Sequence, residues 1–181
     1  MKKQLLFIAL FTLSVLGVNA QSKSSFNKGD NLFNVGVGLG SPYFGTGYSS
    51  SLPVNPSVSY EVGVSNAISV GGQVSYASSK YDGGFNYTFK ESAIYFGARG
   101  SYHFNELLKL NPKFDLYSGV SLGYVTVSIS DNQSTVTGTA SGFGFGLYAG
   151  GKYYLGKSTA IYSELGYQSL SFLNVGIAFK F

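Results

Sequence analysis

The stretch FDLYSGVSLGY, Phe114 to Tyr124, decides the fold, because apolar side chains recur in it at nearly every second position. This alternation is typical of a β-strand with two different faces. One face carries large apolar side chains, namely Phe114, Leu116, Val120, Leu122 and Tyr124. The opposite face carries small or polar ones, namely Asp115, Tyr117, Gly119, Ser121 and Gly123. The segment therefore predicts a strand between two very different environments.

Seven further segments show the same alternation, at residues 33–40, 54–64, 68–76, 94–104, 142–153, 161–168 and 173–181. Every charged residue within the eight segments falls on the Gly-rich face. A soluble sheet would instead expose to water a face that is rich in Lys and Glu. The sequence thus predicts an all-β fold, an eight-stranded antiparallel transmembrane β-barrel with up-and-down meander topology. Its apolar face contacts lipid and its small polar face lines a narrow lumen.

The composition agrees with a membrane barrel and excludes several other classes. Only 11% of the 181 residues are charged, against roughly 25% in soluble domains. The absence of Cys excludes disulfides, thiolate nucleophiles, Cys-ligated metals and a lipid-modified Cys. The formal charge is +4, and it falls to +2 without Lys2 and Lys3, which is no footprint of nucleic-acid binding. We expect neither a cofactor nor a metal.

The N-terminus has the features of a secretory signal peptide. Lys2 and Lys3 precede an apolar stretch, residues 5–16, and small residues follow at 18–20. The apolar stretch is shorter than the roughly 20 residues of a spanning helix. We expect a signal peptide at residues 1–20, cleavage between Ala20 and Gln21, a short periplasmic segment at residues 21–31, and the barrel domain at residues 32–181.

The connections between the strands alternate in length. Long ones are expected at residues 41–53, 78–90 and 128–140, and short ones at 65–67 and 155–158. Barrels of this kind have short periplasmic turns and long external loops, so both termini are expected in the periplasm. Two connections depart from the rule: residues 105–112 are longer than a periplasmic turn, and residues 169–171 are very short for an external loop.

The charged residues of the lumen face are candidates for a functional or structural site. They are Glu61, Arg99, Asp115, Lys152 and Glu164, with Lys180 near the end of the last strand. Three acids thus meet three bases, and enclosed charges must be paired or hydrated. We expect a structural network with Arg99 at its centre, because its five donors can bridge two carboxylates. The alternative is a narrow ion or proton path lined by these charges.

Two other features could carry an activity. Ser101 and His103, the only histidine, share the lumen face of one strand, but no orienting acid is evident, so a serine–histidine hydrolase is not favoured and the protein is not expected to be an enzyme. Aromatic side chains stand among Gly and Ser in the long loops, where they could bind an extracellular ligand or cover the barrel mouth; they are Tyr43, Phe44, Tyr48, Tyr81, Phe85 and Tyr87.

The terminal strand, residues 175–181 (VGIAFKF), ends in Phe. Together with a signal peptide and eight two-faced strands, it resembles the small Gram-negative outer-membrane β-barrel proteins of the OmpX and OmpA-transmembrane type. The resemblance implies a monomer in the outer membrane. It also implies that the barrel-assembly machinery reads Phe179 and Phe181 during biogenesis.

A fold of this kind identifies no single activity. We expect a structural or surface-interaction role through the long external loops. The main alternative is a narrow porin-like channel for ions or small solutes. A lipid-modifying outer-membrane enzyme and a soluble lipocalin-like carrier, whose barrel would be apolar inside, are weaker alternatives.

Overall fold

The computed structural model describes residues 24–41, 49–50, 55–82, 88–132, 137–168 and 170–181. The predicted signal peptide and the cleavage site between Ala20 and Gln21 lie outside these residues. The loop aromatics also lie outside them, except for Tyr81. In the described part of the chain, no helix has the length and hydrophobicity needed to cross a membrane, a finding that does not bear on crossing by strands.

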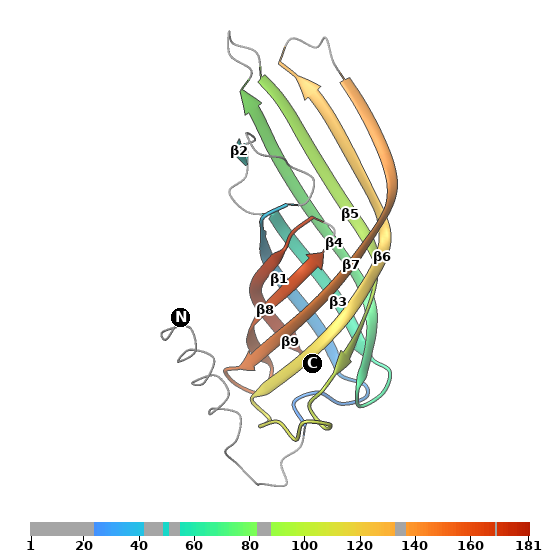
Figure 1. The fold of residues 1–181 in the computed structure, drawn as a ribbon. Coiled ribbons are helices and arrows are strands. Elements are labelled where there is room, and N and C mark those ends of the chain that lie inside the picture. Colours follow the sequence, from blue (N-terminus) through green and yellow to red (C-terminus); the bar gives the residue numbers. More distant parts are fainter. Residues whose placement is uncertain (1–23, 42–48, 51–54, 83–87, 133–136, 169) are drawn as a thin grey trace, which may run out of the picture.

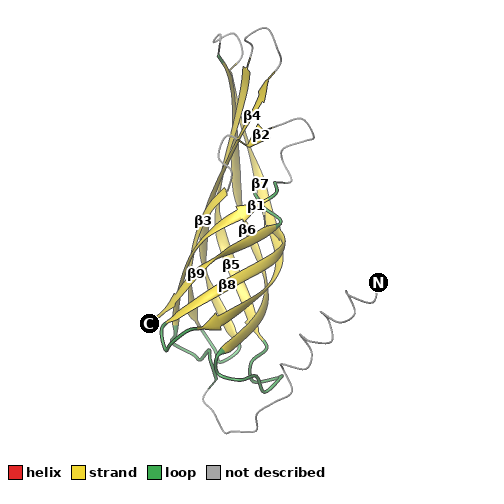
Figure 2. Cartoon of the chain, turned by 90° about the vertical axis from the view of Figure 1, so that its left-hand side faces the viewer, coloured by secondary structure: helices red, strands yellow, loops and turns green. Residues whose placement is uncertain are grey.

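The described residues form one closed antiparallel barrel (Figures 1 and 2). Its elements are β1 (Asn31–Leu39), β2 (Ser49–Ser50), β3 (Asn55–Gly63), β4 (Ile68–Asp82), β5 (Thr88–His103), β6 (Phe114–Asp131), β7 (Thr137–Tyr154), β8 (Thr159–Gln168) and β9 (Leu173–Lys180). β2 is a two-residue strand beside β4. The other eight pair in chain order, and β1 pairs with β9 to close the barrel. The predicted eight-stranded meander is confirmed.

The two faces of the sheet lie as the alternation predicted. Large apolar side chains on the outside stay exposed, for example Val74 at 54%, Leu122 at 62% and Leu165 at 66%. The charged side chains of the same strands are enclosed, with Arg99 only 5% exposed. A soluble lipocalin-like carrier would bury the first set instead. The exterior suits lipid, and the carrier alternative is wrong.

Four of the strands are longer than expected. β4, β5, β6 and β7 rise well above the other four and form a protruding sheet on one side of the barrel (Figure 1). The loops predicted at residues 78–90 and 128–140 are therefore wrong in part, because the strands continue to Asp82 and Asp131 and resume at Thr88 and Thr137. At the outward-facing positions there, Ser, Thr and Lys replace the large apolar residues. The pattern of a lipid-facing strand therefore disappears while the backbone pairing continues.

A large apolar side chain is fully buried at each end of the lumen. At the lower mouth, residues 24–30 cross beneath the lumen, and Phe26 points inward with no exposed surface. Backbone bonds hold this segment, from Gly29 N to Gly63 O and from Gly63 N to Asp30 O, both 2.8 Å. At the upper mouth, Leu170 from the short β8–β9 connection is also fully buried and packs with Tyr95.

Candidate functional site

Arg99 on β5 lies at the centre of the enclosed charges. Its Nη2 lies 2.7 Å from Oε1 of Glu164 on β8, and its Nη1 donates to Gln73 on β4 at 3.1 Å. Its Nε lies 2.9 Å from Oε1 of Glu61 on β3, but off the direction of a good hydrogen bond. The guanidinium lies 4.4 Å from the centre of the Tyr148 ring. One side chain thus links five strands around the lumen.

A second cluster lies beside the first, around Asp115 on β6. Its Oδ1 lies 2.7 Å from His103 Nδ1 and accepts a hydrogen bond from Asn105 Nδ2 at 2.9 Å. Lys152 Nζ is farther away, 3.9 Å from Oδ2, and lies 4.7 Å from the centre of the Tyr117 ring. The structure therefore brings together all five predicted residues, Glu61, Arg99, Asp115, Lys152 and Glu164, in two adjoining clusters.

Lys180 is not part of this network. The sequence had predicted it as the third base beside Arg99 and Lys152, and that prediction is wrong. Its Nζ bonds the carbonyl oxygen of Ser25 at 2.6 Å and lies 3.6 Å from Oδ2 of Asp30. It holds the N-terminal segment at the lower mouth. The other basic residue enclosed beside Arg99 and Lys152 is His103, which the sequence marked only as a partner of Ser101.

The serine–histidine pair also differs from expectation. An acid does orient His103, namely Asp115, and the serine at the other ring nitrogen is Ser69 on the neighbouring strand, 3.0 Å from Nε2. Ser101 instead donates to Glu61 at 2.7 Å. The Ser69 hydroxyl also donates to Glu61, at 2.8 Å, and is fully buried. The serine proton is thus already committed to a carboxylate, unlike that of an activated nucleophile.

Phe26 shields this arrangement from the lower mouth. Its ring stacks on the imidazole of His103, with centroids 3.7 Å apart and planes inclined by 10°. Phe26 stood in a polar segment outside the periodic strands, so no pattern in the sequence marked it. The described residues contain no group of three or more His, Cys, Asp or Glu that could hold a metal ion.

Glycine on the lumen face makes room for the large side chains of the network. A Cβ added to Gly150 would lie 2.7 Å from Tyr117 Cζ and 2.8 Å from Glu164 Cγ. Tyr117 can therefore reach across and donate to Glu164 Oε1 at 2.8 Å. The Gly-rich face predicted for β7 leaves the space that large side chains of other strands occupy. The lumen is therefore filled with side chains rather than with solvent.

The second candidate site is the edge of the protruding sheet. β7 pairs with β8 only from Gly146 downward, because β8 ends at Gln168. Above that point, β6 alone pairs with β7 among the described strands. We call residues 137–142 (TGTASG) the β7 edge; residues 137–141 are exposed and Gly142 is half-buried. On the opposite side of the protruding sheet, β2 covers part of β4 through Ser50 and Ser79.

Hydroxyl pairs join the β7 edge to β6. Thr126 Oγ1 and Ser141 Oγ are 2.9 Å apart, and Ser128 Oγ and Thr139 Oγ1 are 3.4 Å apart. On the other face, nothing lies within 4 Å of a Cβ built on Gly138 or Gly142. The hairpin is thus tied on one face and open on the other.

A closed barrel with an apolar exterior and enclosed charges defines an outer-membrane β-barrel protein. The comparisons agree. Residues 8–180 match the family described as "Outer membrane protein beta-barrel domain", and the chain belongs to this family. It is a protein of the Gram-negative outer membrane. No protein of curated function matches the sequence.

Several solved structures share the fold. Ail of Yersinia pestis, in complex with the heparin analogue sucrose octasulfate, has 14% identity and a TM-score of 0.52, covering 84% of this chain and 95% of that one. OprG of Pseudomonas aeruginosa has 12% identity and a TM-score of 0.54, with coverages of 88% and 99%. The N-terminal barrel of OprF from the same organism has 15% identity and a TM-score of 0.50, with coverages of 86% and 99%. Similarity at this identity concerns the fold alone.

Proposed function

We propose that this protein is a surface-interaction protein that binds an extended segment of a partner polypeptide along the β7 edge. The single observation that carries the proposal is a stretch of β7, raised above the barrel rim, that has a strand on one side only within the described part of the chain. An unpaired edge of this kind offers backbone N–H and C=O groups to an added strand.

The direction of these groups follows from the register. Tyr154 N donates to Lys113 O at 2.8 Å, and β6 pairs with β7 without a bulge from Phe114↔Tyr153 to Ser130↔Thr137. Backbone groups of a regular strand alternate between its two sides. Even-numbered β7 residues therefore direct their N–H and C=O groups toward β6. Thr137, Thr139 and Ser141 direct theirs outward, to the side where a further strand would pair.

The residues of the β7 edge do not protect it. Natural edges are usually guarded by Lys, Pro, bulges or covering segments, whereas the β7 edge contains neither a charge nor a proline. Thr favours strands and small neighbours allow close approach. The open edge thus has the chemistry of a docking strand for an uncharged, extended segment.

Charge does not favour a polyanion such as the heparin analogue that Ail binds. The outer part of this chain carries Lys80 and Lys90 against three acids, Asp82, Glu91 and Asp131. A polyanion site needs a basic excess. We therefore assign the binding to backbone pairing rather than to ion pairing.

The experiment measures binding of a fluorescent octapeptide of alternating Thr and Val to the purified protein in lipid nanodiscs. The peptide should bind saturably, and its N-methylated form, which cannot complete the ladder, should not. Thr139→Pro removes an outward N–H while leaving the bonds to β6, so it should abolish binding. Thr139→Val keeps that N–H and loses only the hydroxyl, so it is the matched control and should bind like the wild type.

Two results would contradict the proposal. One is equal binding of the N-methylated and unmodified peptides. The other is equal binding by the Thr139→Pro and Thr139→Val variants, with both shown to be folded by their mobility on an unheated gel. Either would mean that the β7 edge is not paired by the ligand.

The enclosed charges have a structural role in this proposal. The Ser69 hydroxyl donates its hydrogen bond to Glu61. The His103 ring lies between Ser69, 3.0 Å from Nε2, and Asp115, 2.7 Å from Nδ1. Arg99 and Lys152, together with hydrogen bonds from Ser69, Ser101, Tyr117 and Asn105, compensate the three carboxylates. A lumen filled with paired polar side chains supports a barrel without enzymatic activity and disfavours the channel alternative.

The last strand and the protruding sheet bear on biogenesis and orientation. Phe179 and Phe181 face outward, 40% and 71% exposed, which supports their reading by the barrel-assembly machinery that the family resemblance implies. The protruding sheet lies at the end opposite the short turns, which supports a periplasmic position for both termini. The protein would act as a monomer, embedded in outer-membrane lipid.

A further inference from the structure

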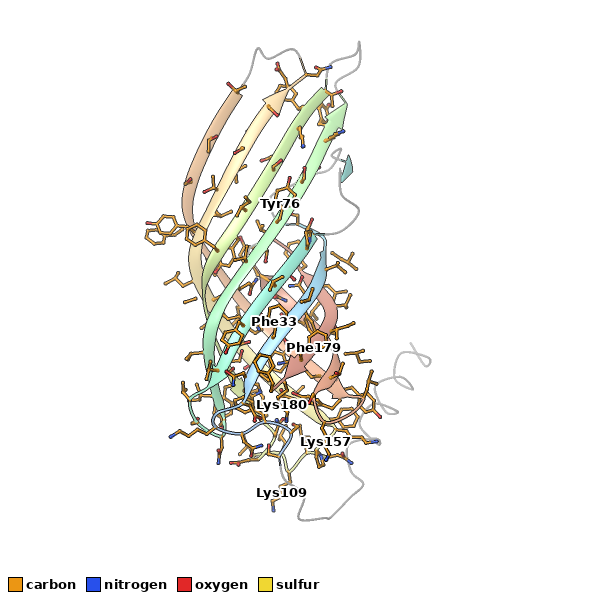
Figure 3. All side chains as sticks on the ribbon, turned by 180° about the vertical axis from the view of Figure 1, so that it is seen from behind. Phe33, Tyr76, Lys109, Lys157, Phe179 and Lys180 are labelled. Atoms are coloured by element: carbon orange, nitrogen blue, oxygen red, sulfur yellow. The ribbon has the colours of Figure 1, made fainter. Side chains whose placement is uncertain are left out.

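A cleft at the lower end of the barrel gathers three lysines. It measures about 390 Å³ and lies between the start of β6, the β7–β8 turn, the end of β9 and the N-terminal segment. Its lining includes Lys113, Lys157 and Lys180 together with Ser25, Tyr154 and Leu155, and none of the described residues that line it is acidic. Lys157 and Lys180 are seen at this end in Figure 3.

The three lysines differ in the contacts that their ammonium groups make. The Lys180 ammonium is fixed by Ser25 O and lies 5.0 Å from the centre of the Tyr154 ring, with Asp30 at 3.6 Å. Lys113 and Lys157 are exposed, and no carboxylate of the described residues lies within ion-pairing distance of either. The cleft therefore has one positive charge in a fixed position, that of Lys180, and two exposed ones, those of Lys113 and Lys157, that are available to bind an anion.

The height of the cleft on the barrel identifies the anion. Lys113 directly precedes Phe114, and Lys180 lies between Phe179 and Phe181, all outward aromatics. Phe114 and Tyr153 pair with ring centroids 5.0 Å apart immediately above the cleft. Outward aromatics mark the boundary between hydrocarbon and headgroups. Lys113 lies one residue, about 3.3 Å along a strand, beyond Phe114. Lys180 is level with the aromatics on β9, and Lys157 lies in the turn below Tyr153. This height matches the level of lipid headgroups.

We propose that this cleft binds the headgroup phosphate of an anionic phospholipid in the periplasmic leaflet. Lys113 and Lys157 would contact the phosphate, and Lys180 would add a fixed charge behind it. The acyl chains would lie along the exposed apolar surface above, where Leu155 and Ile161 are 65% and 51% exposed. Basic clusters at membrane surfaces bind acidic headgroups in this way.

The test measures retention of phosphatidylglycerol against phosphatidylcholine by native mass spectrometry of the purified full chain. The wild type should retain phosphatidylglycerol preferentially. A basic residue near an anionic surface contributes roughly a fivefold gain in affinity, so Lys113→Gln/Lys157→Gln should weaken retention about 25-fold. The matched control is Lys80→Gln/Lys90→Gln, which removes the same charge from the opposite end of the barrel and should change retention less than twofold.

Equal retention of the two lipids by the wild type would overturn the proposal. Equal weakening by the two double variants would also overturn it, because net charge rather than the cleft would then govern binding. If the Lys113→Gln/Lys157→Gln variant does not refold, Lys157→Gln alone, in an exposed turn, should still weaken retention about fivefold. An unchanged value for that variant would reject the site.

Discussion

Replacing Arg99 by Met tests the enclosed network most severely. Met fills a similar volume but removes the contacts to Glu61 at 2.9 Å, Glu164 at 2.7 Å and Gln73 at 3.1 Å. Glu61 keeps its two serine partners and Glu164 keeps Tyr117, but neither keeps a positive partner within ion-pairing distance. Removing one member of a buried ion pair costs about 3–5 kcal/mol. We expect a loss of unfolding free energy of that size.

Urea unfolding in phospholipid vesicles, followed by far-ultraviolet circular dichroism, measures this loss. The matched variant is Arg99→Met/Glu61→Gln/Glu164→Gln, which removes the stranded charges together with the cation. It should recover most of the stability, because replacing a whole buried ion cluster is often nearly neutral. A loss below about 1 kcal/mol for Arg99→Met, the range of an exposed pair, would refute the reasoning. So would a triple variant that is no more stable than the single one.

Three further predictions follow from the lumen. With Phe26 and Leu170 buried at the two mouths, the protein should show no discrete conductance steps in planar bilayers, and reproducible openings would restore the channel alternative. Nitrogen-15 spectra of His103 should show hydrogen on Nδ1, which faces the Asp115 carboxylate, and an Nδ1 without hydrogen would contradict a hydrogen bond between them. Gly71→Ala should cost about 1–3 kcal/mol because its Cβ would collide with the carbonyl of Tyr60; Gly138→Ala, in open space, is the control, and equal costs would contradict the packing argument.

The barrel and its sidedness could be predicted from the sequence because one physical rule acts on every strand. Lipid accepts only apolar side chains outside, and a narrow lumen accepts only small or paired polar ones inside. The alternation along each strand is therefore enough to predict that Leu122 faces outward and Arg99 inward. The same alternation placed Ser69 and Gln73 inside, although it did not single them out.

The hydrogen-bond partners inside the lumen could not be predicted. They depend on the register between strands, whereas the alternation along one strand shows only which face a residue is on. His103 meets Asp115 only because β5 and β6 pair with Tyr117 opposite His103, and Ser69 reaches the ring because it lies opposite Ser101. The protruding sheet was missed for a different reason. Outside the membrane no rule demands apolar residues, so the Thr and Ser of the upper β7 strand look like a loop.

The central claim is that lipid contacts the face carrying Val74 and Leu122 while the face carrying Gln73 and Ser121 is enclosed. The chain has no Cys, so single cysteines at these four positions can be labelled without background. In vesicles with doxyl-labelled acyl chains, fluorophores on Val74→Cys and Leu122→Cys should be strongly quenched. Gln73→Cys and Ser121→Cys should resist labelling until the barrel is unfolded. The opposite pattern would contradict the account.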